Sequence, residues 1–266
     1  MNHAALVREV EDIGFSVLKG GLDPAECAEI VDFMNRTIAA GHVKDPGRGS
    51  SEFHHRICHP IEDPICARLT AHPLLRSVAT ECLRAENLRM RQQMFLLTEP
   101  CGKPGPAKAD GWHVDTLFLP EEWDDAPRKA FLQVFCYATA VRPGGAATLV
   151  VPYSHHRTLA AAGRAAPTTE EQRWQVAGSI VERSGADLRD AIEVTCDAGD
   201  IVFFSPMLLH SGSNCVTDEP RYAFHCSYHD ASATRIRNLP APVFYDTFPA
   251  SMEAAVPAEV RPMLER

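Results

Sequence analysis

The residues best placed to do chemistry lie in the run Gly111-Trp112-His113-Val114-Asp115-Thr116. This run reads as a β-strand, and side chains alternate between the two faces of a strand, so His113 and Asp115 point the same way. An imidazole nitrogen and a carboxylate oxygen on one face can grip a divalent metal ion. The pair therefore predicts two ligands of a metal site, which a further histidine would complete.

His210 is the best candidate for that third ligand, because it ends the apolar run 201–209. Two histidines and one carboxylate leave three positions of an octahedron open, as in non-haem iron(II) oxygenases. A lone His-x-Asp is weak evidence, since it also fits a surface pair in a turn. Its context is more specific: a long sheet-like stretch, Gly-Asp, an apolar strand, His210, a polar turn and then Arg221.

In this order and context, His113, Asp115, His210 and Arg221 resemble the phytanoyl-CoA hydroxylase (phytanoyl-CoA dioxygenase) family of iron(II)- and 2-oxoglutarate-dependent oxygenases. The turn Pro152-Tyr153-Ser154-His155 is similar to the Pro-Gly-Ser-His turn of that family, with tyrosine in place of glycine. The resemblance covers residues 88–230 well and the N-terminal helices loosely. It implies Fe(II) held by the two histidines and the aspartate, with 2-oxoglutarate and O₂ as co-substrates.

The resemblance also implies that Arg221 binds the distal carboxylate of 2-oxoglutarate. A guanidinium group pairs with a carboxylate through two hydrogen bonds and stays charged at every working pH. The alternative is a surface arginine in a loop. Turn-forming residues fill 211–220, so we expect Arg221 to lie beside His210 across a hairpin. Further candidate contacts to the co-substrate are Gln93, Thr116 and Gln133, for which packing or ordinary sheet polarity is at least as good an explanation. A serine after His210, either Ser211 or Ser213, is another candidate.

Substrate contacts are expected from three places in the chain. If Arg221 points inward, alternation puts Ala223, His225, Ser227 and His229 on the inner face of one strand and Tyr222, Phe224, Cys226 and Tyr228 on its outer face. His225 is then either a pocket residue or a satisfied interior histidine. The segment 42–60 lacks periodicity and concentrates histidines and basic residues, so it is either a lid over the metal or a solvated connector. The candidate substrate contacts are His54, Arg56, Phe118, Trp123 and His225.

Composition limits the kinds of partner. The 266 residues carry 26 basic and 35 acidic side chains, a formal net charge of −9, which disfavours nucleic acid. The nine cysteines include no Cys-x-x-Cys, which argues against a disulfide framework and favours a reducing compartment. No apolar run has the length of a membrane span, and the N-terminus does not read as a signal peptide. We expect a cytoplasmic monomer or homodimer that binds a small molecule, without nucleic-acid or membrane partners.

Helical spacing of apolar residues predicts a helix that ends at Gly14, and Asp23-Pro24 with Glu26 predicts the capped start of a second helix. Helices followed by many short strands predict the α+β class. The order fits a double-stranded β-helix, the cupin-like jelly roll, with the N-terminal helices packed outside. Strands are expected at 88–98, 131–141, 146–151, 192–196, 201–204 and 222–228, with 192–196 and 201–204 forming a hairpin. We expect one oxygenase domain over 1–266, with a mainly helical region 1–87, a core 88–230 carrying a helical insertion 157–189, and a peripheral tail 231–266.

The function predicted from these features is a dioxygenase that hydroxylates an unactivated C–H bond of a small or medium-sized polar metabolite or natural-product intermediate, releasing succinate and CO₂. Desaturation, ring closure and epimerisation stay open, whereas Asp115 disfavours halogenation. One alternative is a cupin-like metal-dependent hydrolase or isomerase, which would not need Arg221. The other is a non-catalytic member that binds metal and ligand, which would have no reason to keep all four residues.

Overall fold

The computed structural model describes residues 3–41, 54–58, 63–102, 109, 111–115, 132–162, 179–233, 248 and 250–265. Within these residues, two antiparallel sheets have the strand orders β1-β7-β4-β9-β3-β2 and β6-β5-β8. The larger sheet comprises Phe15–Leu18 (β1), His54–Cys58 (β2), Leu88–Thr98 (β3), Leu132–Tyr137 (β4), Ile201–Phe204 (β7) and Arg221–Asp230 (β9). The smaller sheet comprises Thr148–Val150 (β5), Ile192–Val194 (β6) and His210–Ser211 (β8).

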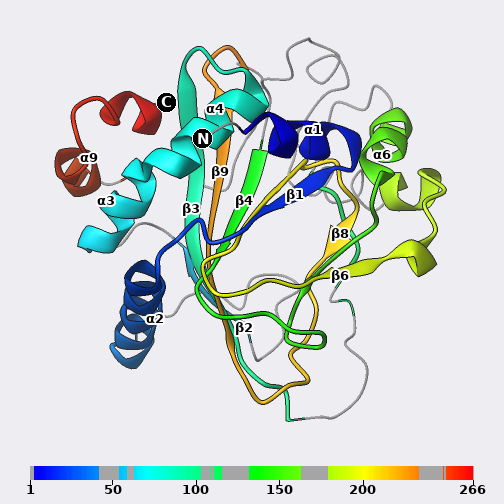
Figure 1. Cartoon of the computed structure of the whole chain (residues 1–266), viewed down its shortest axis with the longest axis horizontal. Helices are drawn as coiled ribbons and strands as arrows, with labels where there is room; N and C mark the ends of the chain where they lie inside the picture. The colour runs from blue at the N-terminus through cyan, green and yellow to red at the C-terminus, as the bar shows by residue number, and fades with distance from the viewer. Residues whose placement is uncertain are drawn as a thin grey trace.

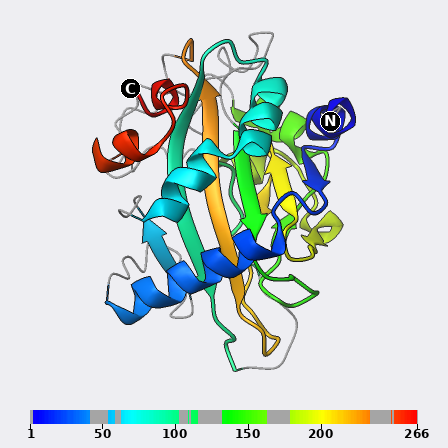
Figure 2. The ribbon, with the colours of Figure 1, turned by 60° about the vertical axis from the view of Figure 1, so that its left-hand side comes forward.

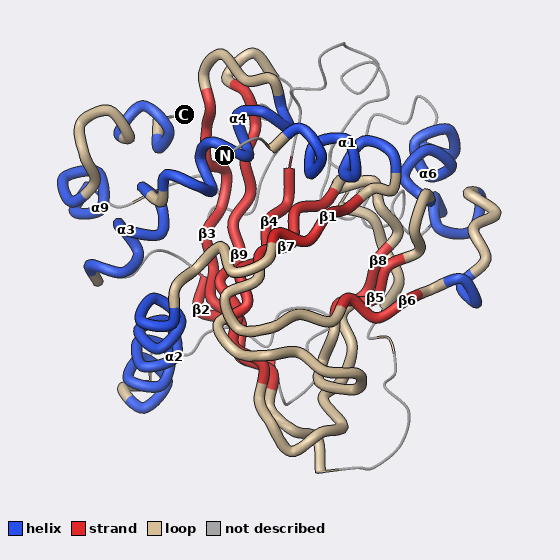
Figure 3. Tube along the Cα trace, in the orientation of Figure 1, coloured by secondary structure: helices blue, strands red, loops and turns tan. Residues whose placement is uncertain are grey.

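The two sheets face each other and enclose the interior of a jelly roll (Figures 1 and 3). Apolar side chains from both sheets pack in this interior, among them Val202 and Phe204 from the larger sheet and Val150 and Val194 from the smaller. Helices lie outside the sheets, so the predicted α+β class and jelly-roll core are confirmed.

Helices cover the outer face of the larger sheet, as Figure 2 shows for α2, α3 and α4. The largest apolar cluster lies between these helices and the outward side chains of β3, β4, β7 and β9. The covering helices are Pro24–Ala39 (α2), Pro64–Ala71 (α3), Pro73–Leu83 (α4) and, near the C-terminus, Ala250–Ala255 (α9) with the short 3₁₀ turn Arg261–Leu264 (η2). The other helices are Ala4–Asp12 (α1), Ser154–Ala162 (α6) and the 3₁₀ turn Leu188–Asp190 (η1).

The start of α2 follows the sequence signal closely. Asp23 accepts a hydrogen bond from the Glu26 backbone N–H at 2.8 Å, and the Glu26 carboxylate accepts one from the Asp23 N–H at 2.8 Å. This capping box satisfies two backbone donors that would otherwise lack helical partners. The helix then buries Ile30, Phe33 and Met34 against the larger sheet.

Strand β9 lies in the middle of the larger sheet and shows the predicted alternation. Tyr222, Phe224, Cys226 and Tyr228 all belong to the cluster beneath the helices. Ala223 belongs to the cluster between the sheets, and His225 contacts Phe135 of that same cluster. All ten residues of β9 are buried, because helices cover one face and the smaller sheet faces the other.

Two expected hairpins are wrong. Residues 192–196 and 201–204 were expected to pair, but β6 pairs with β5 in the smaller sheet, whereas β7 pairs with β1 and β4 in the larger. The turn between them carries the chain from one sheet to the other. Asp200 fixes this corner by accepting hydrogen bonds from the backbone N–H groups of Asp197 and Gly20 and by pairing with Lys19. Likewise, His210 and Arg221 begin β8 and β9 in different sheets rather than flanking a hairpin.

The segment 42–60 was expected to lack secondary structure, and for part of it this is wrong. Residues 54–58 form β2, which pairs with β3 at the edge of the larger sheet. The polar, histidine-rich sequence of this segment does not indicate a strand. The strand forms by pairing with β3, which also sets its register. The remainder of the segment lies outside the described residues, as do residues 163–178 of the expected insertion. Among the described helices, none combines the length and apolarity needed to cross a membrane.

Candidate metal centre

A backbone bridge sets His113 beside His210. The His113 N–H donates to the His210 carbonyl at 2.9 Å, and the His210 N–H donates back at 3.0 Å. The ring centroids consequently lie 4.3 Å apart. The run around His113 is thus one isolated bridge rather than the expected longer strand, yet it still aims His113 and Asp115 at the same point.

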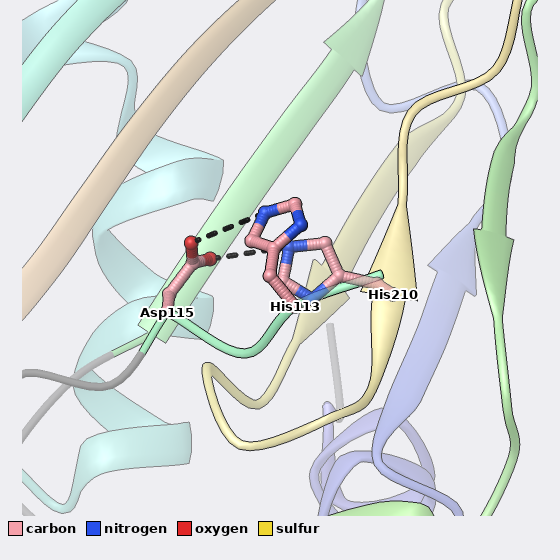
Figure 4. Close-up of side chains that lie close together, drawn as sticks. All are labelled: His113, Asp115 and His210. Carbon is pink, nitrogen blue, oxygen red and sulfur yellow. Dashed lines mark ion pairs between the residues drawn. The ribbon is translucent and has the colours of Figure 1, made fainter. Parts of the chain in front are cut away.

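Asp115 completes a three-residue cluster with the two histidines (Figure 4). Its backbone N–H donates to the Pro206 carbonyl at 2.8 Å, which ties it to the segment before β8. One carboxylate oxygen lies 3.8 Å from His113 Nε2 and the other 3.4 Å from His210 Nε2. Ligand atoms from all three residues lie within 4.8 Å of one another, so they can converge on a single ion.

Both imidazoles hold their second nitrogen on the backbone. His113 Nδ1 lies 2.8 Å from the Gly111 carbonyl, and His210 Nδ1 lies 2.7 Å from the Leu208 carbonyl. Because a carbonyl only accepts, each Nδ1 carries the proton, and each Nε2 keeps its lone pair for a ligand. Two neutral imidazole nitrogens and one carboxylate form a donor set that fits Fe(II).

The charge on Asp115 and the titration of His210 both affect cation binding at this cluster. Burial alone would raise the pKa of the Asp115 carboxyl, but His210, His113 and a hydrogen bond from Gln133 outweigh it and hold the pKa well below its usual range. Burial alone would lower the pKa of His210, but the Asp115 charge and hydrogen bonds to Asp115 and Leu208 raise it. A proton therefore competes with a metal ion for His210.

We expect metal affinity to fall in acid as a result. Binding needs His210 in its unprotonated form, and the raised pKa keeps the proton on to higher pH than for an ordinary histidine. Below that pKa, the apparent affinity should drop about tenfold per pH unit. Titration with Co(II) at several values between about pH 5.5 and pH 8 checks this, within the range where histidine charge changes. An affinity that stays constant over the range would contradict it.

Arg221 lies between the sheets on the inner face of β9 and is buried. Its Nη1 donates to the Ala146 carbonyl at 2.5 Å, and its Nη2 donates to Thr98 Oγ1 at 3.0 Å. Its charge also acts on the Tyr137 phenol, although burial dominates and raises the pKa of Tyr137 to about 12. A guanidinium flanked by hydroxyl groups can receive a carboxylate.

Hydroxyl groups around Arg221 were missed by sequence reasoning. The Tyr137 hydroxyl lies 2.9 Å from Thr148 Oγ1, and Thr98 pairs with Arg221 across the β3–β9 ladder. Strand pairing brings these residues together, and no spacing in the sequence reveals it. Ser213 donates to the Ala147 carbonyl at 2.8 Å, so it supports the stretch 146–147 to which Arg221 also binds.

Two glutamines are placed differently from each other. Gln133 donates from Nε2 to Asp115 Oδ2 at 2.7 Å, so it contacts the metal cluster. Gln93 faces the helices instead and donates to the Cys66 carbonyl and Thr70 Oγ1, which corrects its expected role at the co-substrate. Its neighbour Gln92 is the inward residue and lies 3.2 Å from His225. The register shift between Met90 and Gln92 decides which glutamine faces inward.

Five of the remaining candidate contacts fall outside the described side chains. Thr116, Phe118 and Trp123 lie outside the described residues, and of His54 and Arg56 only the backbone of β2 is described. His225 is buried and contacts Gln133 as well as Gln92.

Comparison with known proteins shows the family of this chain. The profile of the family described as "Phytanoyl-CoA dioxygenase (PhyH)" matches residues 10–223. Among curated protein sequences, none matches the chain.

Three solved structures show the fold. The epimerase SnoN in complex with Fe3+, alpha ketoglutarate and nogalamycin RO is 22% identical, with TM-score 0.66 and coverage of 86% of this chain and 83% of that one. The carbocyclase SnoK from nogalamycin biosynthesis is 20% identical, with TM-score 0.63 and coverage of 85% and 83%. HygX from Streptomyces hygroscopicus with nickel and 2-oxoglutarate bound is 16% identical, with TM-score 0.60 and coverage of 87% and 88%.

Proposed function

Because the chain belongs to the phytanoyl-CoA dioxygenase (PhyH) family of iron(II)- and 2-oxoglutarate-dependent oxygenases, we propose that it hydroxylates an unactivated C–H bond of a small or medium-sized polar molecule. The observation that carries the proposal is the convergence of His113, Asp115 and His210 on one point, with both Nδ1 atoms held by backbone carbonyls so that each Nε2 faces the other ligands. In this proposal, the three residues hold Fe(II) and leave three positions open.

Bound iron would supply the one-electron chemistry that O₂ requires. The protein's own contribution is positioning. The Gly111 and Leu208 carbonyls fix the two imidazole rings, and the backbone bridge between His113 and His210 keeps the rings at a set separation. In the overall reaction, substrate C–H, 2-oxoglutarate and O₂ give substrate C–OH, succinate and CO₂.

Arg221 anchors 2-oxoglutarate by its distal carboxylate in this account. It shares the inner face of β9 with His225, which connects through Gln133 to Asp115. The co-substrate would therefore lie between the sheets, with its other end toward the metal ligands. Tyr137 suits this position, because its raised pKa keeps the phenol neutral beside an anion.

The substrate is proposed to be polar because the inner face of β9 stays polar beyond His225. Ser227 and His229 are both buried, and the Ser227 hydroxyl has no hydrogen-bond partner among the described residues. A buried hydroxyl without a partner is costly, so a polar ligand group would stabilise it. Several structural neighbours are described with natural products or their biosynthesis, namely nogalamycin for SnoN and SnoK and hygromycin B for HygX. A natural-product intermediate is therefore the substrate class to test first.

The neighbours also include an epimerase and a carbocyclase, so the reaction outcome needs its own test. We expect Fe(II)-dependent conversion of 2-oxoglutarate to succinate, stimulated by one or more members of a panel of polar natural-product intermediates. Mass spectrometry of the converted substrate should show one added oxygen atom. An unchanged mass would indicate epimerisation, and loss of two hydrogens would indicate ring closure or desaturation. A lack of succinate with every panel member, in a protein that binds iron, would contradict the oxygenase proposal.

A further inference from the structure

A line of side-chain hydrogen bonds runs from Asp115 across three strands of the larger sheet. Gln133 on β4 donates to Asp115 Oδ2 at 2.7 Å. His225 on β9 places Nε2 2.8 Å from Gln133 Oε1, and Gln92 on β3 places Nε2 3.2 Å from His225 Nδ1. Since β4, β9 and β3 are consecutive neighbours, their inward residues form a continuous chain.

The Asp115 end determines which group donates and which accepts in each hydrogen bond of this line. The Asp115 carboxylate can only accept, so Gln133 must turn its NH₂ group toward it. Gln133 Oε1 then faces His225 and requires a proton on His225 Nε2. Neutral His225 consequently accepts at Nδ1, where Gln92 offers its own NH₂ group. Each residue thus fixes the orientation of the next.

Packing also holds the His225 ring in place. The ring is buried and lies against Phe135, with centroids 4.5 Å apart. Phe135 stacks on Phe204, which in turn meets the His210 ring at 5.2 Å. A ring with both nitrogens hydrogen-bonded and one face covered has little freedom to turn.

We propose that Gln92, His225 and Gln133 are positioning residues that hold the Asp115 carboxylate in one orientation for the metal ion. The inference rests on the proposed function, because it takes Asp115 to be a metal ligand. The Gln133 amide occupies part of Oδ2, which favours coordination through Oδ1 alone. A carboxylate bound through one oxygen leaves three positions open for co-substrate and O₂.

A purely structural role is the competing account, and the backbone argues against it. Backbone pairing already joins β3 to β9 over residues 88–98 and 221–230. It also joins β4 to β9 over residues 132–137 and 223–228. The strands do not need the side-chain line to stay together. Its removal should therefore disturb the carboxylate more than the fold.

Anaerobic titration with Co(II), read from its visible spectrum, tests the proposal. Gln133→Leu and His225→Leu should each weaken Co(II) binding about 10–100-fold and alter the spectrum, the range typical for residues that orient metal ligands. His225→Gln should stay within about threefold of the parent, since its amide N–H replaces the imidazole N–H. If His225 acts through Gln133, the double leucine variant should bind no more weakly than Gln133→Leu alone.

The control is His155→Leu, which removes a buried histidine whose Nε2 bonds the Glu11 carbonyl away from this line. It should lower thermal stability and leave Co(II) affinity unchanged. If His225→Leu does not fold, His225→Asn tests the same bond, because it is polar but too short to reach Gln133.

The proposal is overturned if the His225 variants that remove the donor bind Co(II) like the parent. It is also overturned if His225→Gln binds Co(II) as weakly as His225→Leu does. The same holds if the losses of Co(II) affinity in Gln133→Leu and His225→Leu add in the double variant. If the variants show the predicted Co(II) affinities but the parent protein does not turn over 2-oxoglutarate, the proposed reaction is refuted and the positioning role is supported. A parent protein that binds no Co(II) would refute both.

Discussion

Alanine at His113, Asp115 or His210 is expected to abolish turnover. Each change removes one of three donors that converge within 4.8 Å, and the two remaining donors hold an ion poorly. Loss of a residue that merely orients a ligand typically costs 10–100-fold, so loss of a ligand itself should cost more than about 100-fold in metal affinity. Iron binding by equilibrium titration and succinate formation are the measurements.

The fold should survive these changes, because apolar clusters on both sides of the larger sheet hold it together. Far-ultraviolet circular dichroism should therefore match that of the parent. His156→Ala is the matched control: His156 is an exposed histidine on α6, outside the cluster, and its loss should leave iron binding unchanged. Parent-like iron affinity in all three cluster variants would refute this metal site.

Arg221→Ala is expected to weaken 2-oxoglutarate binding by at least about thirtyfold. The change removes a buried guanidinium group and leaves a carboxylate without its partner in the interior. Loss of such a pair costs about 2–5 kcal/mol, and each 1.4 kcal/mol corresponds to about tenfold in affinity. The dissociation constant of 2-oxoglutarate, measured in the presence of iron, reports the effect directly.

Two further variants separate the role of Arg221 from a general charge effect. Arg221→Lys keeps the charge but loses the two-pronged geometry, so it should fall between the parent and Arg221→Ala. Arg142→Ala removes an exposed arginine paired with Asp197 and should leave the dissociation constant of 2-oxoglutarate unchanged. Unchanged 2-oxoglutarate binding in Arg221→Ala would move the anchor elsewhere and revive a metal-dependent hydrolase or isomerase that needs no such residue.

Local signals in the sequence were sufficient for much of this fold. The cap at Asp23 and Glu26 defined α2, and alternation along 221–229 assigned both faces of β9 correctly. These features depend on neighbouring residues only. The pairing of 201–204 with β1 and β4 depends on partners far along the chain, and turn-forming residues at 197–200 suggested a local hairpin instead.

In the candidate site too, local features could be predicted from the sequence, whereas features that depend on strand pairing could not. His113 and Asp115 could be paired from a spacing of two, and His210 from its place after an apolar strand. The line through Gln92, His225 and Gln133 could not be predicted, because it requires the register of three strands at once. With two adjacent glutamines, a shift of one residue exchanges the inward and outward faces, so the sequence alone does not distinguish Gln92 from Gln93.

We propose that this chain holds iron at His113, Asp115 and His210 and presents 2-oxoglutarate to it from Arg221. Anaerobic titration of the parent with Fe(II) and 2-oxoglutarate tests it most directly, since the two bound together give a visible charge-transfer band. We predict that the band develops in the parent, is absent in Asp115→Ala, and needs far more 2-oxoglutarate in Arg221→Ala. A parent protein that binds both compounds without the band, or an unchanged band in Asp115→Ala, would contradict the account.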